Sequence, residues 1–357
     1  MYRPGLEQLP SYQVGEEPVW TSKLDANERS AALPQAVRNE ISRRMRQVQA
    51  HRYPELDAKG LRTLLAAGFG LSVGQVNVGN GSSELIGAVC SALGGVGRPI
   101  AFQWPSFSMY PIYAAIAGSP AVAIPLDEQY RVSVDVVLQK VKQSGAKLLI
   151  LCNPNNPTGG VIPAADLRRI LQEVACPVLV DEAYHEYCGE TCLSWLAEYP
   201  NLMLARTFSK AYGLASARIG YLLASPEISQ SIGKLMLPYH INSYSLAAAE
   251  VCFSMREILM QEVRRTMQRR DRLFRQLKKF DFVQVFPSAT NFLLIKVAKP
   301  EVLDKIFIRA GIGIRNFSQA PGLEGCLRIT VGTAHESQSI LACVQQYGEM
   351  SAVGVIE

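Results

Sequence analysis

Short, unbroken apolar segments alternate with longer amphipathic ones through the middle of this chain. Continuous apolarity is typical of strands buried on both faces of a sheet, and alternation with helix-length spacers is typical of βαβ units. The predicted strands are 76–79, 99–103, 121–125, 147–152, 177–181, 202–207 and 219–224. We therefore predict an α/β protein whose seven-stranded, mostly parallel sheet is sandwiched by helices.

The pattern changes after residue 242, where a long helical stretch at about 245–278 precedes short, separated segments. The strands predicted there are 283–286, 292–296, 312–315 and 327–331, and the helices lie near 300–310 and 335–347. This mixture of short strands and helices indicates a smaller α+β domain. The N-terminal segment is rich in proline, so we expect it to wrap across both lobes. We predict a large domain at 41–255 and a small domain formed by 1–40 and 256–357.

Composition narrows the functional class. The chain has 357 residues, 48% hydrophobic and 19% charged, with a net charge of +5, which is typical of a soluble, enzyme-sized protein. Basic residues cluster at 264–279, but apolar residues interleave with them at helical spacing. That favours an amphipathic helix with a solvated face over a nucleic-acid site. Since no apolar stretch reaches the roughly 18 residues of a membrane span, we predict neither a nucleic-acid nor a membrane partner.

The cysteines are scattered, and most of them stand in apolar segments. Cys188 and Cys192 are close in sequence, but no second pair follows at zinc-ligand spacing, so we predict no metal site. Thiols distributed in this way are typical of reduced cysteines, which indicates a cytoplasmic protein.

Lys210 is the first candidate for chemistry. It follows the predicted strand 202–207 and stands in the segment Thr-Phe-Ser-Lys-Ala-Tyr-Gly. A desolvated amine is activated for attack on a carbonyl, which is Schiff-base chemistry. Thr207 and Ser209 supply hydroxyls for a phosphate, and Arg218 supplies a planar fork. Carbonyl chemistry beside a phosphate site points to pyridoxal 5′-phosphate (PLP), whereas a surface lysine after a buried strand is the plain alternative.

Three further motifs follow predicted strands, and the carboxyl ends of parallel strands gather functional groups. Asp181 ends one strand, where a carboxylate suits a pyridine nitrogen or else caps a helix. The turn Asn-Pro-Asn-Asn-Pro-Thr-Gly at 153–159 suits an amide donor to a phenolate, with a cis peptide before Pro157. The loop Gly-Asn-Gly-Ser-Ser-Glu at 79–84 opens a helix toward a phosphate. Because Glu84 takes the place of a third glycine, this loop departs from the dinucleotide fingerprint.

These motifs, in this order, resemble the class II aminotransferases, a family of fold-type I PLP-dependent enzymes. The segment 207–216 is similar along its whole length to the family's PLP-attachment signature, Thr-aromatic-Ser-Lys-Ala-x-Gly-x-x-Ser. The likeness covers nearly the entire chain and is strongest to the histidinol-phosphate aminotransferase subgroup. Other segments that are similar to this subgroup are 24–28, 52–55, 105–110, 288–292 and 325–333. The subgroup usually has Asn-Glu-Asn-Pro near the N-terminus, whereas this chain has Asn-Glu-Arg-Ser at 27–30.

The resemblance implies a set of residues that hold the cofactor. Lys210 would carry PLP covalently and move a proton during the reaction, and Asp181 would pair with the pyridine nitrogen. Tyr184 and Asn156 would bond the phenolic oxygen, and Phe107 would stack on the ring. The residues expected to hold the phosphate are Ser82, Ser83, Thr207, Ser209 and Arg218.

The resemblance also implies substrate contacts and a partner. Arg328 would bind the anionic end of the substrate, with Arg315 assisting and Tyr12 lining the pocket. Tyr53 would reach the phosphate of the neighbouring subunit's cofactor, which predicts a homodimer. The departure at 29–30 edges the substrate site, so it bears on specificity.

The function predicted in this way is a PLP-dependent aminotransferase of histidine biosynthesis. It would convert L-histidinol phosphate and 2-oxoglutarate to imidazole-acetol phosphate and L-glutamate. An aromatic amino-acid aminotransferase is the first alternative, and a threonine-phosphate decarboxylase is the second. A PLP-binding regulator would need a further DNA-binding domain, and a nucleotide-binding oxidoreductase would need the third glycine. The preference between imidazole and phenyl side chains and the amino acceptor stay open.

Overall fold

A seven-stranded sheet forms the centre of the computed structural model, which describes residues 19–352. The strand order is β2-β8-β7-β6-β5-β3-β4. The strands are β2 (Val76–Gly79), β3 (Ile100–Trp104), β4 (Ala121–Pro125), β5 (Leu148–Cys152), β6 (Val178–Asp181), β7 (Leu202–Thr207) and β8 (Gly220–Ala224). The predicted strands are therefore confirmed. β8 runs antiparallel to both of its neighbours, β2 and β7, while β3 to β7 pair in parallel.

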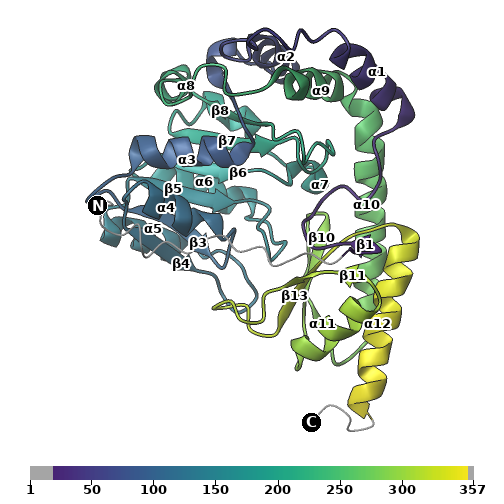
Figure 1. Ribbon diagram of the computed structural model, residues 1–357. Coiled ribbons are helices and arrows are strands. Elements are labelled where there is room, and N and C mark those ends of the chain that lie inside the picture. Colours follow the sequence, from purple (N-terminus) through teal and green to yellow (C-terminus); the bar gives the residue numbers. More distant parts are fainter. Residues whose placement is uncertain (1–18, 353–357) are drawn as a thin grey trace, which may run out of the picture.

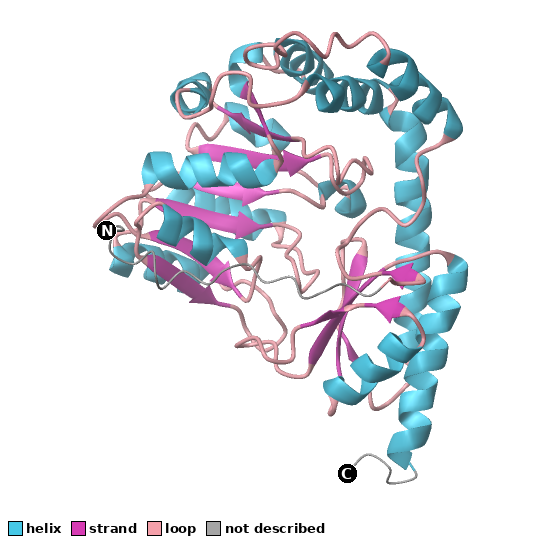
Figure 2. Cartoon of the chain, viewed as in Figure 1, coloured by secondary structure: helices cyan, strands magenta, loops and turns pink. Residues whose placement is uncertain are grey.

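Helices cover both faces of this sheet (Figure 1, Figure 2). One face carries α3 (Ser82–Leu93), α4 (Met109–Ile116) and α8 (Pro226–Gly233). The other carries α2 (Lys59–Phe69), α5 (Val134–Ser144), α6 (Ala164–Glu173) and α9 (Ser243–Ser254). In β5, Leu148 and Ile150 belong to the first core, and Leu149 and Leu151 belong to the second. Because both faces of β5 are buried, this strand is apolar throughout rather than alternating.

A smaller lobe contains a four-stranded sheet of order β12-β13-β10-β9. Its strands are β9 (Gln284–Val285), β10 (Phe292–Lys296), β12 (Arg315–Asn316) and β13 (Cys326–Thr330). α11 (Pro300–Arg309), α12 (Ala334–Ala352) and the end of α10 (Arg256–Leu277) cover it. The single strand predicted at 312–315 is wrong. Ile314 separates β11 (Ile312–Gly313), which pairs with β1 (Ser22–Lys23), from β12, which pairs with β13.

The helical stretch predicted at 245–278 is two helices, α9 and α10, which meet at Met255. No proline or glycine stands near this residue, so the sequence does not mark the break. α9 is buried over most of its surface in the large lobe, whereas α10 runs from the large lobe to the small one (Figure 1). The long helix α10 therefore connects the two lobes.

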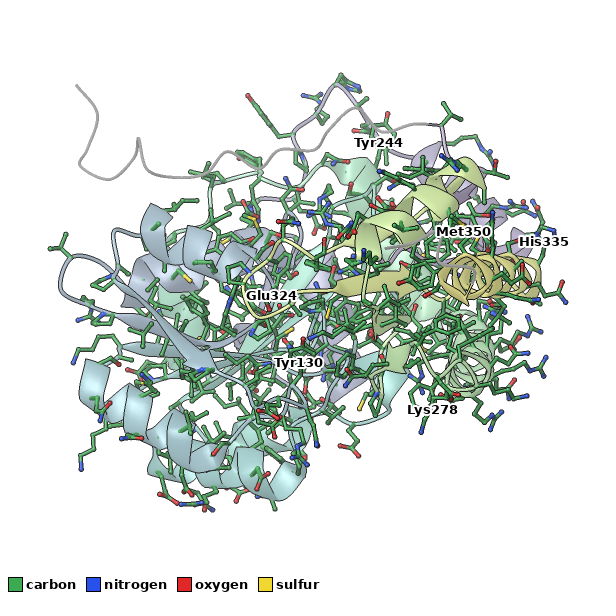
Figure 3. All side chains as sticks on the ribbon, turned by 90° about the horizontal axis from the view of Figure 1, so that it is seen from below. Tyr130, Tyr244, Lys278, Glu324, His335 and Met350 are labelled. Atoms are coloured by element: carbon green, nitrogen blue, oxygen red, sulfur yellow. The ribbon has the colours of Figure 1, made fainter. Side chains whose placement is uncertain are left out.

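The lobes also meet through side chains. Tyr130 of the large lobe and Glu324 of the small lobe both lie where the two lobes meet (Figure 3). Its hydroxyl donates a hydrogen bond to the Gly322 carbonyl at 3.1 Å, and its ring lies 4.9 Å from that of Phe286. The two lobes thus share a packed boundary besides their covalent connection.

The predicted boundary between residues 40 and 41 falls within α1 (Gln35–Met45). Val37 and Ile41, on either side of it, both belong to the core of the large lobe. The division into two domains stays a prediction. Two short helices, α7 (His185–Cys188) and the 3₁₀ turn Leu193–Ala197, follow β6, and another 3₁₀ turn, Val73–Gln75, precedes β2. Among the described residues, no helix is long and apolar enough to cross a bilayer.

Candidate active site

A cavity of about 310 Å³ lies at the carboxyl ends of β5, β6 and β7, facing the small lobe. Strand ends of a parallel sheet leave such a crevice because their connections diverge to opposite faces. The cavity brings together most of the residues predicted from the sequence. Those that line it are Ser82, Ser83, Phe107, Asn156, Asp181, Tyr184, Thr207, Ser209, Lys210, Arg218, Arg315 and Arg328.

Lys210 stands in a tight turn directly after β7. The turn is closed by the Gly213 amide, which donates to the Lys210 carbonyl at 3.1 Å, and Gly213 has φ +69°. Nζ of Lys210 donates to the carbonyl oxygen of Ala26 at 2.7 Å. Burial lowers the pKa of the lysine to about 7, and the nearby guanidinium of Arg328 acts in the same direction. A large share of the amine is therefore neutral, and so nucleophilic, at neutral pH.

Asp181 ends β6 and is buried. The Tyr110 hydroxyl donates to its Oδ2 at 2.8 Å, and the Ala183 amide donates to its Oδ1 at 3.2 Å. Burial raises the pKa of this carboxyl to about 6, while these two donors lower it. Asp181 is thus a mainly ionised carboxylate at neutral pH, held in one orientation at the floor of the cavity.

Two further polar groups face the cavity from the side opposite the phosphate-binding candidates. The Tyr184 hydroxyl accepts a hydrogen bond from Asn27 Nδ2 at 2.9 Å, and burial raises its pKa to about 12. Tyr184 is therefore protonated and has a proton to donate. Oδ1 of Asn156 accepts from Arg328 Nη1 at 2.6 Å, which makes Nδ2 the donor side of this amide. The peptide before Pro157 is cis, as predicted.

The opposite end of the cavity is a cradle of donors. α3 begins at Ser82, so its N-terminal amides and the positive end of its dipole point there. Gly220 of β8 permits this close approach, because a Cβ at that position would lie 2.1 Å from the Ser82 nitrogen. Arg218 has φ +53°, and its Nη1 donates to Ser209 Oγ at 3.3 Å. This set of donors fits a phosphate dianion.

The small lobe supplies a pair of arginines. Arg315 of β12 stands opposite Arg328 of β13 in the antiparallel register. Arg328 is buried, and it donates to the Asp25 carbonyl through Nη2. The guanidinium carbons of Arg328 and Arg315 lie 5.5 Å and 6.0 Å from the ring of Phe317. Two guanidinium groups therefore lie side by side, on the side of the cavity opposite the seven-stranded sheet.

Two predicted residues are not brought into this cavity. The Tyr53 side chain is 82% exposed, stacks on Tyr239 at a centroid distance of 4.8 Å, and does not line it. Tyr12 lies outside the described residues. Sequence reasoning missed Tyr110 and Asn27, which hold Asp181 and Tyr184. Both stand in segments that resemble the subgroup, but nothing in the sequence indicates their partners.

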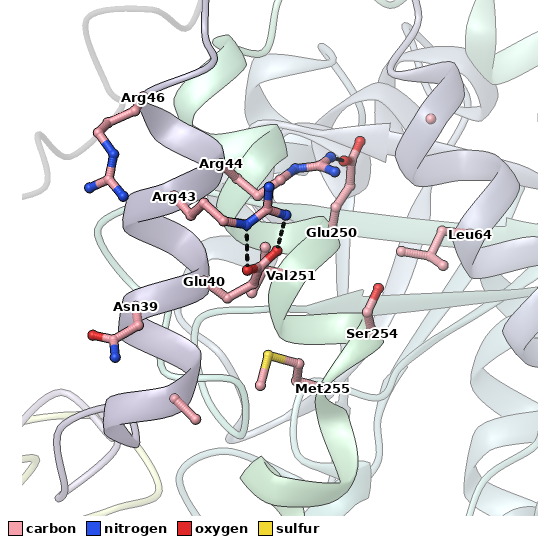
Figure 4. Close-up of a pocket in the computed structure, with 12 residues that line it drawn as sticks. Asn39, Glu40, Arg43, Arg44, Arg46, Leu64, Glu250, Val251, Ser254 and Met255 are labelled. Atoms are coloured by element: carbon pink, nitrogen blue, oxygen red, sulfur yellow. Dashed lines mark hydrogen bonds and ion pairs between the residues drawn. The ribbon is translucent and has the colours of Figure 1, made fainter.

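A larger cavity, of about 910 Å³, lies between α1, α2 and α9 (Figure 4). Four of its charged groups form pairs: Arg43 contacts Glu40 at 2.6 Å, and Arg44 contacts Glu250 at 2.5 Å. Among the described residues that line it there is no lysine, so it offers no amine for Schiff-base chemistry. The candidate active site is therefore the smaller cavity, which contains Lys210.

The chain is similar over nearly its whole length to known proteins. The family model "Aminotransferase class I and II" matches residues 21–344. A histidinol-phosphate aminotransferase of Caldanaerobacter subterraneus subsp. tengcongensis is 35% identical over 347 residues, covering 97% of this chain and 98% of that protein. One of Thermoanaerobacter sp. is 36% identical over 342 residues, covering 96% and 97%. The structure of the Sinorhizobium meliloti histidinol-phosphate aminotransferase in complex with PLP has a TM-score of 0.85 and 26% identity, covering 96% and 95%.

Proposed function

This chain belongs to the class I and II aminotransferases, and we propose that within this family it converts L-histidinol phosphate and 2-oxoglutarate to imidazole-acetol phosphate and L-glutamate. The family and the fold class predicted from the sequence are confirmed, and so is the cofactor, because this family depends on PLP. The proposed substrates are supported by relatives at about 35% identity that carry the histidinol-phosphate name over nearly the whole chain.

The residues at both ends of the cavity support PLP as its ligand. The N-terminus of α3, Ser209 and Arg218 would hold the phosphate, and the Asp181 carboxylate would pair with the pyridine nitrogen. When bound, PLP supplies an electron sink that stabilises negative charge at the α carbon of the substrate. Phe107 covers one face of the ring in this proposal, and it packs edge-on against Tyr110 at 5.6 Å.

Each side chain has a distinct task in this arrangement. Asp181, ionised above its pKa of about 6, keeps the pyridine nitrogen protonated. Tyr184 and Asn156 donate to the phenolic oxygen. Ser82, Ser83 and Thr207 complete the phosphate site, with Thr207 Oγ1 also accepting from the Ser209 amide at 3.0 Å.

Lys210 both attaches the cofactor and moves the proton. Its pKa of about 7 leaves a neutral, nucleophilic amine that would hold PLP covalently. With PLP bound, Nζ would be the base that takes the proton from the α carbon of the substrate and passes it to the cofactor. The Ala26 carbonyl, 2.7 Å from Nζ, holds the amine over the cavity.

The pair Arg315 and Arg328 is the observation that carries the substrate assignment. A phosphate monoester is a dianion at neutral pH, and two adjacent guanidinium groups match its charge and its oxygens. For the second substrate, the same pair would meet a carboxylate. We include Tyr12 in the substrate pocket on the resemblance alone.

The proposed assembly is a homodimer in which Tyr53 reaches the partner's phosphate site. The support is a group of exposed apolar side chains beside Tyr53, since such a patch is typical of an interface. Leu56, Leu237 and Tyr239 belong to it, with exposed fractions of 57%, 71% and 43%. All eight cysteines are free thiols and seven of them are buried, which supports a cytoplasmic location.

The test is the absorbance of the purified PLP-loaded protein, recorded as histidinol phosphate is added without an oxo-acid acceptor. We expect the visible band of the bound cofactor to bleach at low substrate, with phenylalanine needing a far higher concentration. Subsequent 2-oxoglutarate should restore the band. A response to aromatic amino acids alone would leave the reaction type standing and would contradict the substrate. Absence of the band after addition of PLP would contradict the role of Lys210.

A further inference from the structure

Arg29 stands at the edge of the active site, where this chain departs from the sequence usual in its subgroup. The segment before it is part of the cavity, because the Asp25 and Ala26 carbonyls accept from Arg328 and Lys210. That segment is held by the small lobe. The Asn27 amide donates to Thr330 Oγ1 at 3.0 Å, and Asn291 Nδ2 donates to the Asn27 carbonyl at 3.0 Å.

The side chain of Arg29 leaves the small lobe and contacts the turn that carries Lys210. Its Nη1 donates to the carbonyl of Ala211, the residue after the lysine, at 2.8 Å. Its stem lies against Gly213, where an added Cβ would lie 2.7 Å from Arg29 Cδ. Arg29 thus contacts the turn at two points, and Gly213 leaves the space that the stem occupies.

The same nitrogen also contacts the helix that connects the lobes. Arg29 Nη1 donates to the Leu259 carbonyl of α10 at 3.3 Å. Next to it, Ser30 Oγ accepts from Arg269 Nη2 at 3.3 Å, and that nitrogen also contacts Glu262 at 2.5 Å. One guanidinium therefore joins three parts of the chain that are far apart in sequence.

We propose that Arg29 is a positioning residue for Lys210. It fixes the lysine turn against the 25–28 segment and α10, so that Nζ is held at the Ala26 carbonyl. The inference rests on the proposed role of Lys210 in carrying PLP. Arg29 does not line the cavity, so it acts through the turn rather than on the substrate.

The test compares Arg29→Met with Arg269→Met in the PLP-loaded protein. Methionine keeps an apolar stem against Gly213 and removes the donors, and Arg269 is a matched control because it bonds Ser30 without touching the lysine turn. The first readout is the pKa obtained from the pH dependence of the cofactor absorbance. The second is the division of the kinetic change between kcat and KM, and the third is Tm.

In R29M we expect the spectroscopic pKa to rise by about half a unit or more, because a looser turn admits water and relieves the burial that disfavours the charged form of the cofactor-bonded lysine nitrogen. We expect kcat to fall by about threefold to tenfold with little change in KM, since the substrate contacts are intact. R269M should keep wild-type values of the pKa and of kcat.

A lower Tm in R29M with unchanged spectroscopic pKa and kcat would make Arg29 purely structural and overturn the proposal. If R29M does not fold, the same measurements are made on R29K. Lysine keeps the positive charge, but its nitrogen does not reach the position of the guanidinium nitrogens. We therefore expect a smaller rise of the spectroscopic pKa than in R29M. Wild-type values in R29K would then overturn the proposal. Wild-type protein that shows no cofactor band would instead contradict the proposed function.

Discussion

The reactivity of Lys210 comes from its surroundings. Burial, with the guanidinium of Arg328 in support, lowers the pKa of its amine from 10.5 to about 7. Only the neutral amine attacks PLP, so in cofactor-free protein the rate of PLP capture should rise with pH through about 7 and then level off. Stopped-flow absorbance between pH 5.5 and pH 10 measures it. A rate that still rises steeply between about pH 9 and pH 10 would mean an ordinary lysine.

Tyr110 keeps the carboxyl of Asp181 ionised. Its hydrogen bond lowers the pKa of Asp181, which burial has raised to about 6, so removing the donor should raise that pKa further. In Tyr110→Phe the acid limb of the pH–rate profile should therefore move to higher pH. The expected loss of kcat is about tenfold at neutral pH and smaller at alkaline pH.

The matched control for this change is Tyr199→Phe. The Tyr199 hydroxyl contacts Arg168 and Gln172 on the large lobe, outside the cavity. It should leave the acid limb in place. If Y110F and the wild type had equal pH profiles, Tyr110 would have no influence on the protonation of Asp181.

At the scale of elements, the start of α3 depends on β8. A Cβ at Gly220 would lie 2.1 Å from the Ser82 nitrogen and 2.5 Å from the Gly81 carbonyl carbon, both of them backbone atoms. Gly220→Ala should therefore push the N-terminus of α3 away from the phosphate site and weaken PLP binding by about tenfold or more. Equilibrium dialysis or fluorescence titration with PLP measures the Kd.

Gly87→Ala provides the comparison on the same helix. A Cβ there meets the ring of Tyr113 at 3.7 Å, which is ordinary contact, so the Kd for PLP should not change. Alanine also favours a helix interior over glycine, so Tm should hold or rise. An unaltered Kd in G220A would show that the cradle tolerates a displaced helix.

The bounds of some helices and strands were predicted correctly from the sequence, and those of others were not. β2, β4 and β7 have the predicted bounds. β2 and β7 are buried along their whole length, which favours apolar residues on both faces, whereas β4 lies largely exposed at the sheet edge. The break at Met255 was missed, since no proline or glycine marks it. The division at Ile314 was missed as well, because it depends on two different pairing partners that only the folded chain brings close.

The same distinction applies to the site. Asp181 ends β6, Lys210 follows β7 and Arg218 precedes β8. Because these strand ends carry recognisable motifs, local sequence was enough to predict that the three residues lie together. The bond from Tyr110 to Asp181 spans 71 positions, and the bond from Asn27 to Tyr184 spans 157. Such contacts are set by packing between elements, and no spacing rule in one sequence reveals them.

At the scale of the whole molecule, the proposed homodimer makes a specific prediction. If each site takes Lys210 from one subunit and Tyr53 from the other, Lys210→Ala and Tyr53→Ala should complement each other. Each variant alone should be nearly inactive or strongly impaired. Unfolding and refolding them together would give mixed dimers with one intact site, and activity near about a quarter of the wild-type value is expected from random pairing.

The control is the same mixing with Tyr244→Ala, an exposed tyrosine of α9 that lies outside the cavity. Mixed dimers with K210A should then retain only the sites of the Y244A subunits, with no gain over the separate proteins. Sedimentation velocity confirms that exchange has occurred. If the K210A–Y53A mixture recovered no activity although its subunits had exchanged, Tyr53 would not contribute to the neighbouring subunit's site.

The pairing of Arg315 with Arg328 has a practical consequence for redesign. The groups proposed to bind the cofactor stand on the seven-stranded sheet and its connections, whereas this pair stands on two neighbouring strands of the other lobe. Arg328 also bonds Asn156 and lowers the pKa of Lys210, so it must stay in place. A combinatorial library confined to residues 315 and 317 should therefore vary the accepted substrate among clones that still bind the coloured cofactor.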